Sequence, residues 1–443
     1  MKKIQLFVAL ICYILSFFTI EAKRIDVEKA EKVARSYART TVRLTERRDF
    51  KLTKTVSRQI VRKRTDKQSI TSQQQQNEPM FYVFTMNGNG GFVIISGDDI
   101  AKPILGYSDN GTYDENNPNL AYWMETLSQE IADAVENGIA QDEQTKAEWE
   151  AFESESKATA AASGGDFVDP LITTRWDQEA PYNNLCPQIS RTRTATGCVA
   201  TTMAQIMRFH RYPTTRTKTI PGYTTQTKRI TVPAIAGTFT YKWDDMTDIY
   251  TSSSSKASQD AVAELIYHCG VGVQMDYGLA SDNGSGASSS DVAPALKDYF
   301  GYDAGIAHHY REYYTYSEWT NMLKTEIKAG RPVYYSGSNN DSGHAFVCDG
   351  YDAGGLFHFN WGWSGSSDGY FEISALNPNS TGTGGSSKGY NQLQEIVTGI
   401  QPDKGGEAIV QLYLSKFYAN KTLLNSLSET FDITMEELGN IGS

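Results

Sequence analysis

One cysteine lies where the chain changes from a glycine turn to a helical pattern. Cys198 follows Gly197, and apolar residues then recur at mainly helical spacing up to residue 211, before Pro213. The first turn of a helix offers unpaired backbone N–H groups and the positive end of the dipole, and both favour a thiolate. Taken alone, Cys198 is either a nucleophile or a small buried core residue.

A histidine further along the chain could serve as the base for this thiol. His344 follows a glycine and begins a β-patterned run, so a strand would hold its imidazole in a fixed direction. The imidazole could then take the thiol proton and return it to a leaving amine. The separation of 146 residues from Cys198 lies within the roughly 130–150 residues between nucleophile and base in papain-type peptidases.

An amide and two indoles follow in the segment FHFNWGW, residues 357–363. Asn360 could orient the imidazole of His344, and Trp361 could shield the hydrogen bond from water. Alternatively, Asn360 is a turn residue, and Trp361 and Trp363 are core aromatics. Histidines and cysteines do not occur at zinc-site spacings, and no nucleophile-elbow serine motif is present, which disfavours metalloenzymes and serine hydrolases.

The first 22 residues have the pattern of a secretion signal. Lys2 and Lys3 precede an apolar run, 4–20, and the small Ala22 stands at a plausible cleavage point. We therefore expect a signal peptide over 1–22 and a secreted mature chain, extracellular, periplasmic or on the cell surface, without a transmembrane segment. The alternative is an uncleaved anchor, because the run approaches the length that spans a bilayer.

Charge is distributed unevenly along the chain. The 443 residues carry a net charge of −11, yet residues 23–67 contain sixteen basic and six acidic residues. An acidic chain disfavours general binding to nucleic acid, which requires a basic field. Helical spacing over 27–37 predicts an amphipathic helix with a basic outer face. That face is either solvated or docked on an acidic partner in the same chain.

The remaining N-terminal block is structural in character. Apolar runs at 81–84 and 92–95 flank a Gly-rich turn and predict a hairpin, and a helical stripe over 120–135 stops at Gly138. Residues 151–165 consist mostly of small and polar residues, so this stretch should be exposed to proteases. A non-catalytic block, a cleavable linker and a larger second block form the layout of a zymogen.

Three motifs in the second block resemble those of streptopain-type cysteine peptidases, the bacterial papain-clan group that includes interpain-like enzymes. They are ATGCVATTMAQIM at 195–207, GHAFV at 343–347 and NWGWSG at 360–365. The segments FVIISG at 92–97 and ILGY at 104–107 also resemble the prosegment of that family. The resemblance therefore extends over most of the chain, from about residue 25 to residue 402.

This resemblance implies a papain-like fold of the α+β class, with a helical half and a β-rich half, preceded by an α+β propeptide domain. The expected divisions are a signal peptide at 1–22, a propeptide at 23–160, a catalytic domain at 161–402 and the start of a C-terminal extension at 403–443. In the family the prosegment inhibits by displacing the catalytic histidine, and its removal activates the enzyme. An apolar run at 408–414 predicts a strand in the extension.

By the same resemblance, Cys198 is the nucleophile and His344 the general base and acid of an endopeptidase that works through an acyl-enzyme. Trp361 is expected to support the histidine, with Asn360 as the alternative. The backbone N–H of Cys198 would be one oxyanion donor. The second donor stays open, because Thr192 stands where some relatives carry glutamine.

Substrate contacts are expected at two glycines and two larger residues. Gly197 and Gly343 would leave room for a substrate backbone. Family members favour a bulky apolar residue two positions before the scissile bond, and Met275 and Tyr277 would form part of its pocket.

No cofactor and no metal are expected. The expected partners are protein or peptide substrates and the chain's own propeptide, acting as an intramolecular inhibitor. Cys186, Cys269 and Cys348 are expected to be buried free thiols. Two rival functions stay open: a non-catalytic surface binding protein on the same scaffold, and a cysteine acyltransferase that passes the acyl group to an amine.

Overall fold

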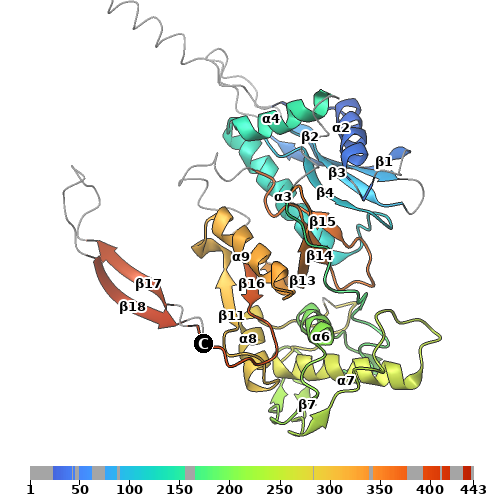
Figure 1. Ribbon diagram of the computed structural model, residues 1–443, viewed down its shortest axis with the longest axis vertical. Helices are drawn as coiled ribbons and strands as arrows, with labels where there is room; N and C mark the ends of the chain where they lie inside the picture. The colour runs from blue at the N-terminus through green and yellow to red at the C-terminus, as the bar shows by residue number, and fades with distance from the viewer. Residues whose placement is uncertain are drawn as a thin grey trace, which may run out of the picture. The chain divides into compact units, whose positions relative to one another are not determined.

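The computed structural model describes residues 23–41, 43–44, 49–61, 75–86, 90–154, 165–282, 284–338, 343–376, 393–409, 412–419 and 433–440 (Figure 1). The expected signal peptide and most of the linker lie outside these ranges. The chain forms two compact units. Unit 1 comprises Met1–Phe167, Tyr351–His358 and Ser366–Asn391, and unit 2 comprises Val168–Gly350, Phe359–Gly365 and Gln392–Ser443.

Unit 1 is built on an antiparallel sheet in the strand order β1-β2-β3-β4-β15. The strands are β1 (Phe50–Ile60), β2 (Gln76–Met86), β3 (Phe92–Ser96), β4 (Ile104–Ser108) and β15 (Gly369–Phe371). Strands β2 and β3 confirm the hairpin expected from the two apolar runs. Both are buried along nearly their whole length, because helices cover the two faces of the sheet.

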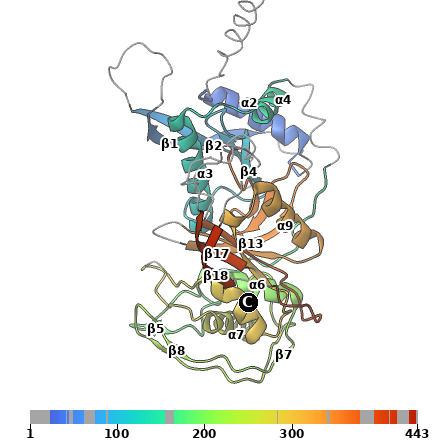
Figure 2. The ribbon, with the colours of Figure 1, turned by 90° about the vertical axis from the view of Figure 1, so that its left-hand side faces the viewer.

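Three helices pack on this sheet: α2 (Val27–Thr40), α3 (Pro118–Asn137) and α4 (Glu143–Glu153). Helices α2 and α4 lie side by side (Figure 2), and they share a core with alternate residues of the strands. Helix α3 packs on β1 and β2. As expected, α3 ends at Gly138, whose φ of 64° suits glycine.

The basic segment of the N-terminal block pairs with acidic residues of the same block. Lys54 pairs with Glu115 and Arg58 with Glu125, while Lys29 lies 2.6 Å from a carboxylate oxygen of Glu153. The acidic partner of these described residues is thus the rest of the N-terminal block. Surface ion pairs of this kind contribute little individually, typically about 0–1 kcal/mol each.

Strand β15 comes from the second half of the sequence and extends the sheet of the N-terminal block. Tyr370 pairs with Tyr107 and Phe371 with Gly106, and the rings of Tyr370 and Tyr107 stack with centroids 5.0 Å apart. A Cβ at Gly106 would lie 2.5 Å from a ring carbon of Phe371, so glycine is required for this close approach. The N-terminal block is therefore held by main-chain hydrogen bonds to a strand of the later sequence.

Unit 2 combines helices with a second group of strands. The helices are α6 (Cys198–His210), α7 (Lys256–Gly272), α8 (Val292–Asp298) and α9 (Tyr316–Lys328), with short 3-10 turns at Ser289–Asp291 and Arg311–Tyr313. The main strands follow the order β14-β13-β12-β16-β11. They are β11 (Ala307–Tyr310), β12 (Val333–Ser338), β13 (Gly343–Tyr351), β14 (Phe357–Asn360) and β16 (Gln394–Thr398). The first residues of β14 and the last residue of β13 belong to unit 1.

Three two-residue ladders lie in the helical half of unit 2. They pair β5 (Gln188–Ile189) with β6 (Thr192–Arg193), β7 (Thr215–Arg216) with β10 (Phe239–Thr240), and β8 (Tyr223–Thr224) with β9 (Thr231–Val232). Helices α6 and α7 pack together (Figure 1) and share one apolar core with residues of β12, β13 and β16. The expected combination of a helical half and a β-rich half is confirmed.

The last described elements form a separate antiparallel hairpin of β17 (Leu412–Ala419) and β18 (Ile433–Asn440). The strand predicted at 408–414 overlaps β17 at 412–414, whereas residues 408–409 are irregular and residues 410–411 lie outside the described residues. Apolar composition marked the region, but pairing with β18 sets the bounds. Among the residues that the structure describes, none of the helices has the length and hydropathy needed to cross a bilayer.

Candidate active site

Cys198 is the first residue of α6, as the sequence predicts. Gly197 caps the helix with φ 85° and ψ 139°, a conformation that L residues rarely adopt. A Cβ there would lie 2.6 Å from Sδ and Cε of Met275 and 3.0 Å from the carbonyl oxygen of Ser285. Backbone strain and close packing thus both require glycine immediately before the nucleophile.

The turn that leads to Cys198 is fixed by hydrogen bonds on both sides. The N–H of Ala195 donates to the carbonyl of Gly278 at 3.0 Å, and the hydroxyl of Ser285 donates to the carbonyl of Ala195 at 2.7 Å. The hydroxyls of Thr196 and Thr201 lie 2.8 Å apart. The backbone N–H of Cys198 is therefore held in place before any substrate arrives, as an oxyanion donor requires.

His344 lies at the head of β13, also as predicted, opposite Gly337 of β12. Cys198 packs against the core that includes the next residue, Ala345, and the backbone N–H of Ala345 lowers the pKa of the Cys198 thiol. The fold thus brings the thiol of Cys198 near Ala345, the residue that follows His344, although Cys198 and His344 lie 146 residues apart in the sequence.

Burial controls the protonation of both groups. It raises the pKa of the Cys198 thiol, and the N–H groups of Ala345, Val199 and Cys198 lower that pKa only in part. Burial also lowers the pKa of His344 to about 4. At neutral pH this conformation holds a neutral thiol and a neutral imidazole. The thiolate preference expected from the helix start is outweighed here by desolvation.

The carboxamide of Asn360 is engaged in bracing contacts. Its Nδ2 donates to the carbonyl of Thr174 at 2.7 Å, and its Oδ1 accepts from Nε2 of Gln205 and from the N–H of Gly362, both at 3.1 Å. These contacts favour the interpretation of Asn360 as a turn residue. Its role as an orienting residue for His344 stays an untested prediction.

Trp361 is fully buried beside the strand that carries His344. Its ring contacts Phe346, two residues after His344 on β13, with centroids 4.8 Å apart, and Phe359 at 5.2 Å. The indole therefore packs against the β13 framework, consistent with a supporting role for the histidine.

The remaining expected substrate residues fall into two groups. Met275 is fully buried against Gly197, and Tyr277 lies behind it against Gly270, so neither side chain opens to solvent in this conformation. Gly343 is exposed at the start of β13 and leaves space on its outer side. The pocket assignment to Met275 and Tyr277 stays a prediction.

Two glutamines that sequence reasoning did not assign lie in this region. Gln178 accepts a hydrogen bond from the N–H of Thr196 at 3.0 Å through its backbone carbonyl, which places it beside the nucleophile turn. Gln205 is fully buried on α6. The helical spacing of Gln205 from Cys198 could have revealed it, whereas no local pattern marks Gln178, twenty residues before the nucleophile.

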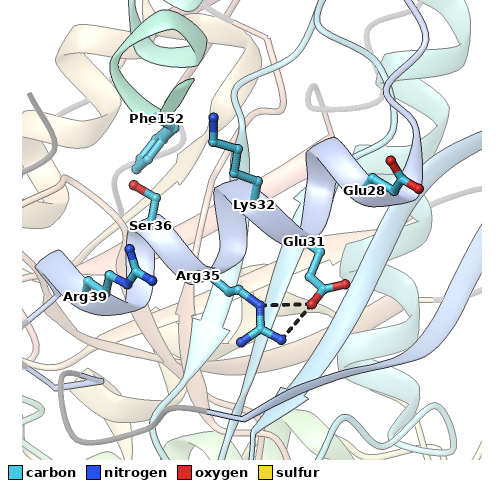
Figure 3. Close-up of a pocket in the computed structure, with 7 residues that line it drawn as sticks. All are labelled: Glu28, Glu31, Lys32, Arg35, Ser36, Arg39 and Phe152. Carbon is cyan, nitrogen blue, oxygen red and sulfur yellow. Dashed lines mark hydrogen bonds and ion pairs between the residues drawn. The ribbon is translucent and has the colours of Figure 1, made fainter. Parts of the chain in front are cut away.

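A cavity of about 310 Å³ lies elsewhere, along α2 and beside Phe152 of α4 (Figure 3). Its wall is formed by Glu28, Glu31, Lys32, Arg35, Ser36, Arg39 and Phe152. Arg35 pairs with Glu31, and Lys32 donates to the carbonyl of Glu153, so its charges are partly satisfied within unit 1. The cysteine and the histidine belong to unit 2.

Three other cysteines among the described residues are free thiols, buried as predicted: Cys186, Cys269 and Cys348. Burial raises the pKa of the Cys186 thiol to about 12, so it stays protonated at neutral pH. Cys198 differs from them in being only partly buried. It is thus the thiol that a substrate or reagent could reach.

A cysteine that opens a helix, a histidine that opens a strand and a core shared by a helical and a β-rich half define a papain-like cysteine peptidase. The Peptidase C10 family model matches residues 176–371, and the Spi protease inhibitor model matches residues 22–131. The chain is 34% identical over 347 residues to streptopain of Streptococcus pyogenes, covering 72% of this chain and 80% of that protein. This chain therefore belongs to the Peptidase C10 family.

Two further similarities agree with this assignment. The thiol protease/hemagglutinin PrtT of Porphyromonas gingivalis is 35% identical over 335 residues, 74% of this chain and 38% of that protein. The structure of a prointerpain A fragment from Prevotella intermedia matches with a TM-score of 0.60 and 32% identity, over 78% of this chain and 99% of that fragment. The expected papain-like fold, the cysteine-type peptidase class and the presence of a propeptide are confirmed.

Proposed function

We propose that this protein is a secreted cysteine endopeptidase, made as an inactive zymogen, in which Cys198 is the nucleophile and His344 the base and acid. The observation that carries the proposal is the packing of Cys198, at the start of α6, against the core that contains Ala345, the residue after His344 on β13, whose N–H lowers the pKa of the Cys198 thiol. It joins the helix start to the strand head, which is the juxtaposition that a thiol–imidazole pair needs.

The reaction we propose is acyl transfer to water. His344 takes the proton of the Cys198 thiol, and the thiolate attacks the carbonyl carbon of a peptide bond. The protonated imidazole then gives its proton to the departing amine as the C–N bond breaks, leaving a thioester on Cys198. Water, deprotonated by His344, hydrolyses the thioester and releases the acid. Trp361 would support the imidazole by packing beside β13.

The oxyanion would be held by the backbone N–H of Cys198 and by the side chain of Gln178. Gln178 is about nine-tenths buried beside the nucleophile turn, and its carboxamide makes no hydrogen bond within the described part of the chain. Its carboxamide is thus available to bind a group that enters the site. Donation from this carboxamide to a developing negative charge would stabilise the transition state.

Gln178→Ala should therefore lower kcat by roughly 10²–10³-fold with little change in KM, because an oxyanion donor acts mainly in the transition state. Steady-state kinetics on a peptide substrate, with the enzyme concentration set by active-site titration, measure this. Gln188→Ala, a change at an exposed residue of β5, is the matched control and should leave kcat unchanged. Equal kcat for wild type and Gln178→Ala would exclude Gln178 as a donor.

The division of the chain follows from the same proposal. Residues 1–22 would direct export, 23–160 would form the propeptide that inhibits the enzyme, 161–402 the catalytic domain and 403–443 the start of an extension. The match of residues 22–131 to the Spi protease inhibitor model supports the inhibitory role. Substrates would be proteins or peptides with a bulky apolar residue two positions before the cleaved bond.

Labelling with a thiol-reactive epoxide inhibitor tests the function directly. We expect one label per molecule of activated enzyme, located by mass spectrometry on Cys198, and loss of peptidase activity in step with labelling. Sequencing the new N-terminus of incubated precursor, with and without inhibitor, locates the activating cleavage. Absence of label at Cys198 would instead favour a binding protein, and transfer of the acyl group to an added amine in place of water would favour an acyltransferase.

A further inference from the structure

Gln205 shares a face of α6 with the nucleophile. It follows Cys198 by seven residues, two helical turns, so both side chains project from the same side of the helix. Gln205 is 0% exposed. A fully buried carboxamide is uncommon, since it must satisfy an acceptor and two donors without water. Its partners therefore indicate why it is there.

The partners form a closed ring of hydrogen bonds. Oε1 of Gln205 accepts from the hydroxyl of Thr174 at 2.8 Å, and its Nε2 donates to Oδ1 of Asn360 at 3.1 Å. Nδ2 of Asn360 returns to the carbonyl of Thr174 at 2.7 Å. The N–H of Trp176 also approaches Oε1 of Gln205, at 3.5 Å. The ring thus joins α6 to the end of β14 and to the segment that begins unit 2.

The ring also fixes the turn after β14. Oδ1 of Asn360 accepts from the N–H of Gly362 at 3.1 Å, and a Cβ at Gly362 would lie 3.7 Å from Nε2 of Gln205. Gly362 adopts a φ of 66°. Trp361 stands between Asn360 and Gly362, the two residues that this hydrogen bond joins. Trp361 packs on Phe346 of β13, the strand that carries His344. Through Asn360 and Trp361, Gln205 therefore links the helix of Cys198 to the strand of His344.

We propose that Gln205 is a positioning residue that aligns the Cys198 helix with the Trp361 turn, so that thiol and imidazole meet in reactive geometry. This inference rests on the proposed roles of Cys198 and His344. Gln205 itself does not touch the reacting atoms. It acts through the direction of its hydrogen bonds, because an apolar side chain of equal size could fill the space without fixing the distance from α6 to Asn360.

Gln205→Leu keeps the volume and removes the hydrogen bonds. We expect kcat per titrated active site to fall by about 10–100-fold, as for a displacement of reacting groups by up to an ångström, with KM little changed. The rate of epoxide labelling of Cys198 should fall in parallel, since labelling depends on the same thiol–imidazole pair. A merely structural role would lower the melting temperature and the yield of active sites, but not kcat per site.

Thr202→Val is the matched control. Thr202 lies on the same helix at 1% exposure, and its hydroxyl makes no hydrogen bond within the described residues. Removing that hydroxyl should leave kcat per site and the labelling rate unchanged. If Gln205→Leu behaved like this control, the inference would be wrong while the roles of Cys198 and His344 stood.

Gln205→Glu provides a second readout that does not depend on stability. The ring partners Thr174, Trp176 and Asn360 are uncharged, so burial should raise the pKa of the introduced carboxyl. Protonated, it can donate to Asn360 as the amide does, but ionised it cannot. Activity relative to wild type should therefore rise towards low pH for Gln205→Glu and stay flat for Gln205→Leu. If the activity relative to wild type did not change with pH for either variant, the inference would be wrong. Full activity of Cys198→Ala would instead overturn the proposed function on which the inference rests.

Discussion

Replacing Cys198 with alanine should abolish peptide hydrolysis and leave the precursor at full length. The change removes the sulfur that would form the thioester, and loss of a nucleophile in a hydrolase costs on the order of 10⁶-fold in kcat. The fold should persist, because alanine suits the first turn of α6 and Cys198 is only partly buried. Gel analysis of incubated precursor and hydrolysis of a fluorogenic peptide measure the two effects.

Cys186→Ala is the control for this experiment. Its thiol is fully buried in the apolar core, where its raised pKa keeps it protonated. This variant should lose some stability but still process itself and hydrolyse the peptide. Continued cleavage of substrate by purified Cys198→Ala protein would show that the nucleophile lies elsewhere.

A buried ion pair ties the N-terminal block to the segment that follows β15. Nζ of Lys102 lies 2.7 Å from a carboxylate oxygen of Glu372, and both side chains are 12% exposed. Their backbones are engaged as well: the N–H of Lys102 donates to the carbonyl of Ala375, and the N–H of Glu372 donates to the carbonyl of Leu105. Within unit 1, this pair lies at the contact that removal of the proposed propeptide, 23–160, would break.

Burial raises the pKa of Glu372 from 4.5 to about 7, against the lowering effect of Lys102, and the nearby Glu148 and Asp352 carboxylates raise it further. A carboxyl group with a raised pKa in the folded state stabilises that state fully below its unfolded pKa. The contribution is lost as pH rises through the folded pKa. The zymogen contact should thus weaken between about pH 4.5 and pH 7.

Lys102→Met should destabilise the full-length protein by about 1–2 kcal/mol at pH 8. Loss of the cation raises the pKa of Glu372 further, so the buried carboxyl takes up a proton, and protonation one unit above the wild-type pKa of about 7 costs about 1.4 kcal/mol. At pH 5 the carboxyl is largely protonated, so the loss should be much smaller. Urea unfolding at both pH values, in the Cys198→Ala background to prevent processing, measures the two free energies.

Lys146→Met is the control for the ion pair. Lys146 lies 4.0 Å from Glu143, whose side chain is 91% exposed, so its loss should change stability by less than about 1 kcal/mol at either pH. Equal destabilisation by Lys102→Met at pH 5 and pH 8 would mean that Lys102 acts by packing and not by its charge.

Local patterns predicted the elements that carry the proposed dyad. Glycine before a helical run placed Cys198 at the start of α6, and glycine before a β-patterned run placed His344 at the head of β13. Such predictions succeed because helix starts and strand periodicity depend on neighbouring residues. The strand predicted at 408–414 overlaps β17 only at 412–414, because the bounds of β17 depend on its pairing with β18 and not on apolar composition alone.

The site contains more than these patterns indicated. Asn360 was considered as a partner of the imidazole, but its carboxamide is occupied by Gln205, Thr174 and Gly362. No local pattern points to Gln178, because it stands twenty residues before the nucleophile and only the fold brings it to the turn before α6. A buried amide can take partners from any segment that folds beside it, and sequence spacing does not encode that choice.

Motifs of contiguous residues were enough to predict the family, the order of the N-terminal block and the peptidase, and the two residues proposed to react. No sequence pattern indicated that the later strand β15 extends the sheet of the N-terminal block or that Gln205 and Asn360 share one hydrogen-bonded ring. Periodicity shows which face of an element is buried. The partner of that face is chosen by packing and by hydrogen bonds between segments far apart in the chain, and these form only in the folded protein.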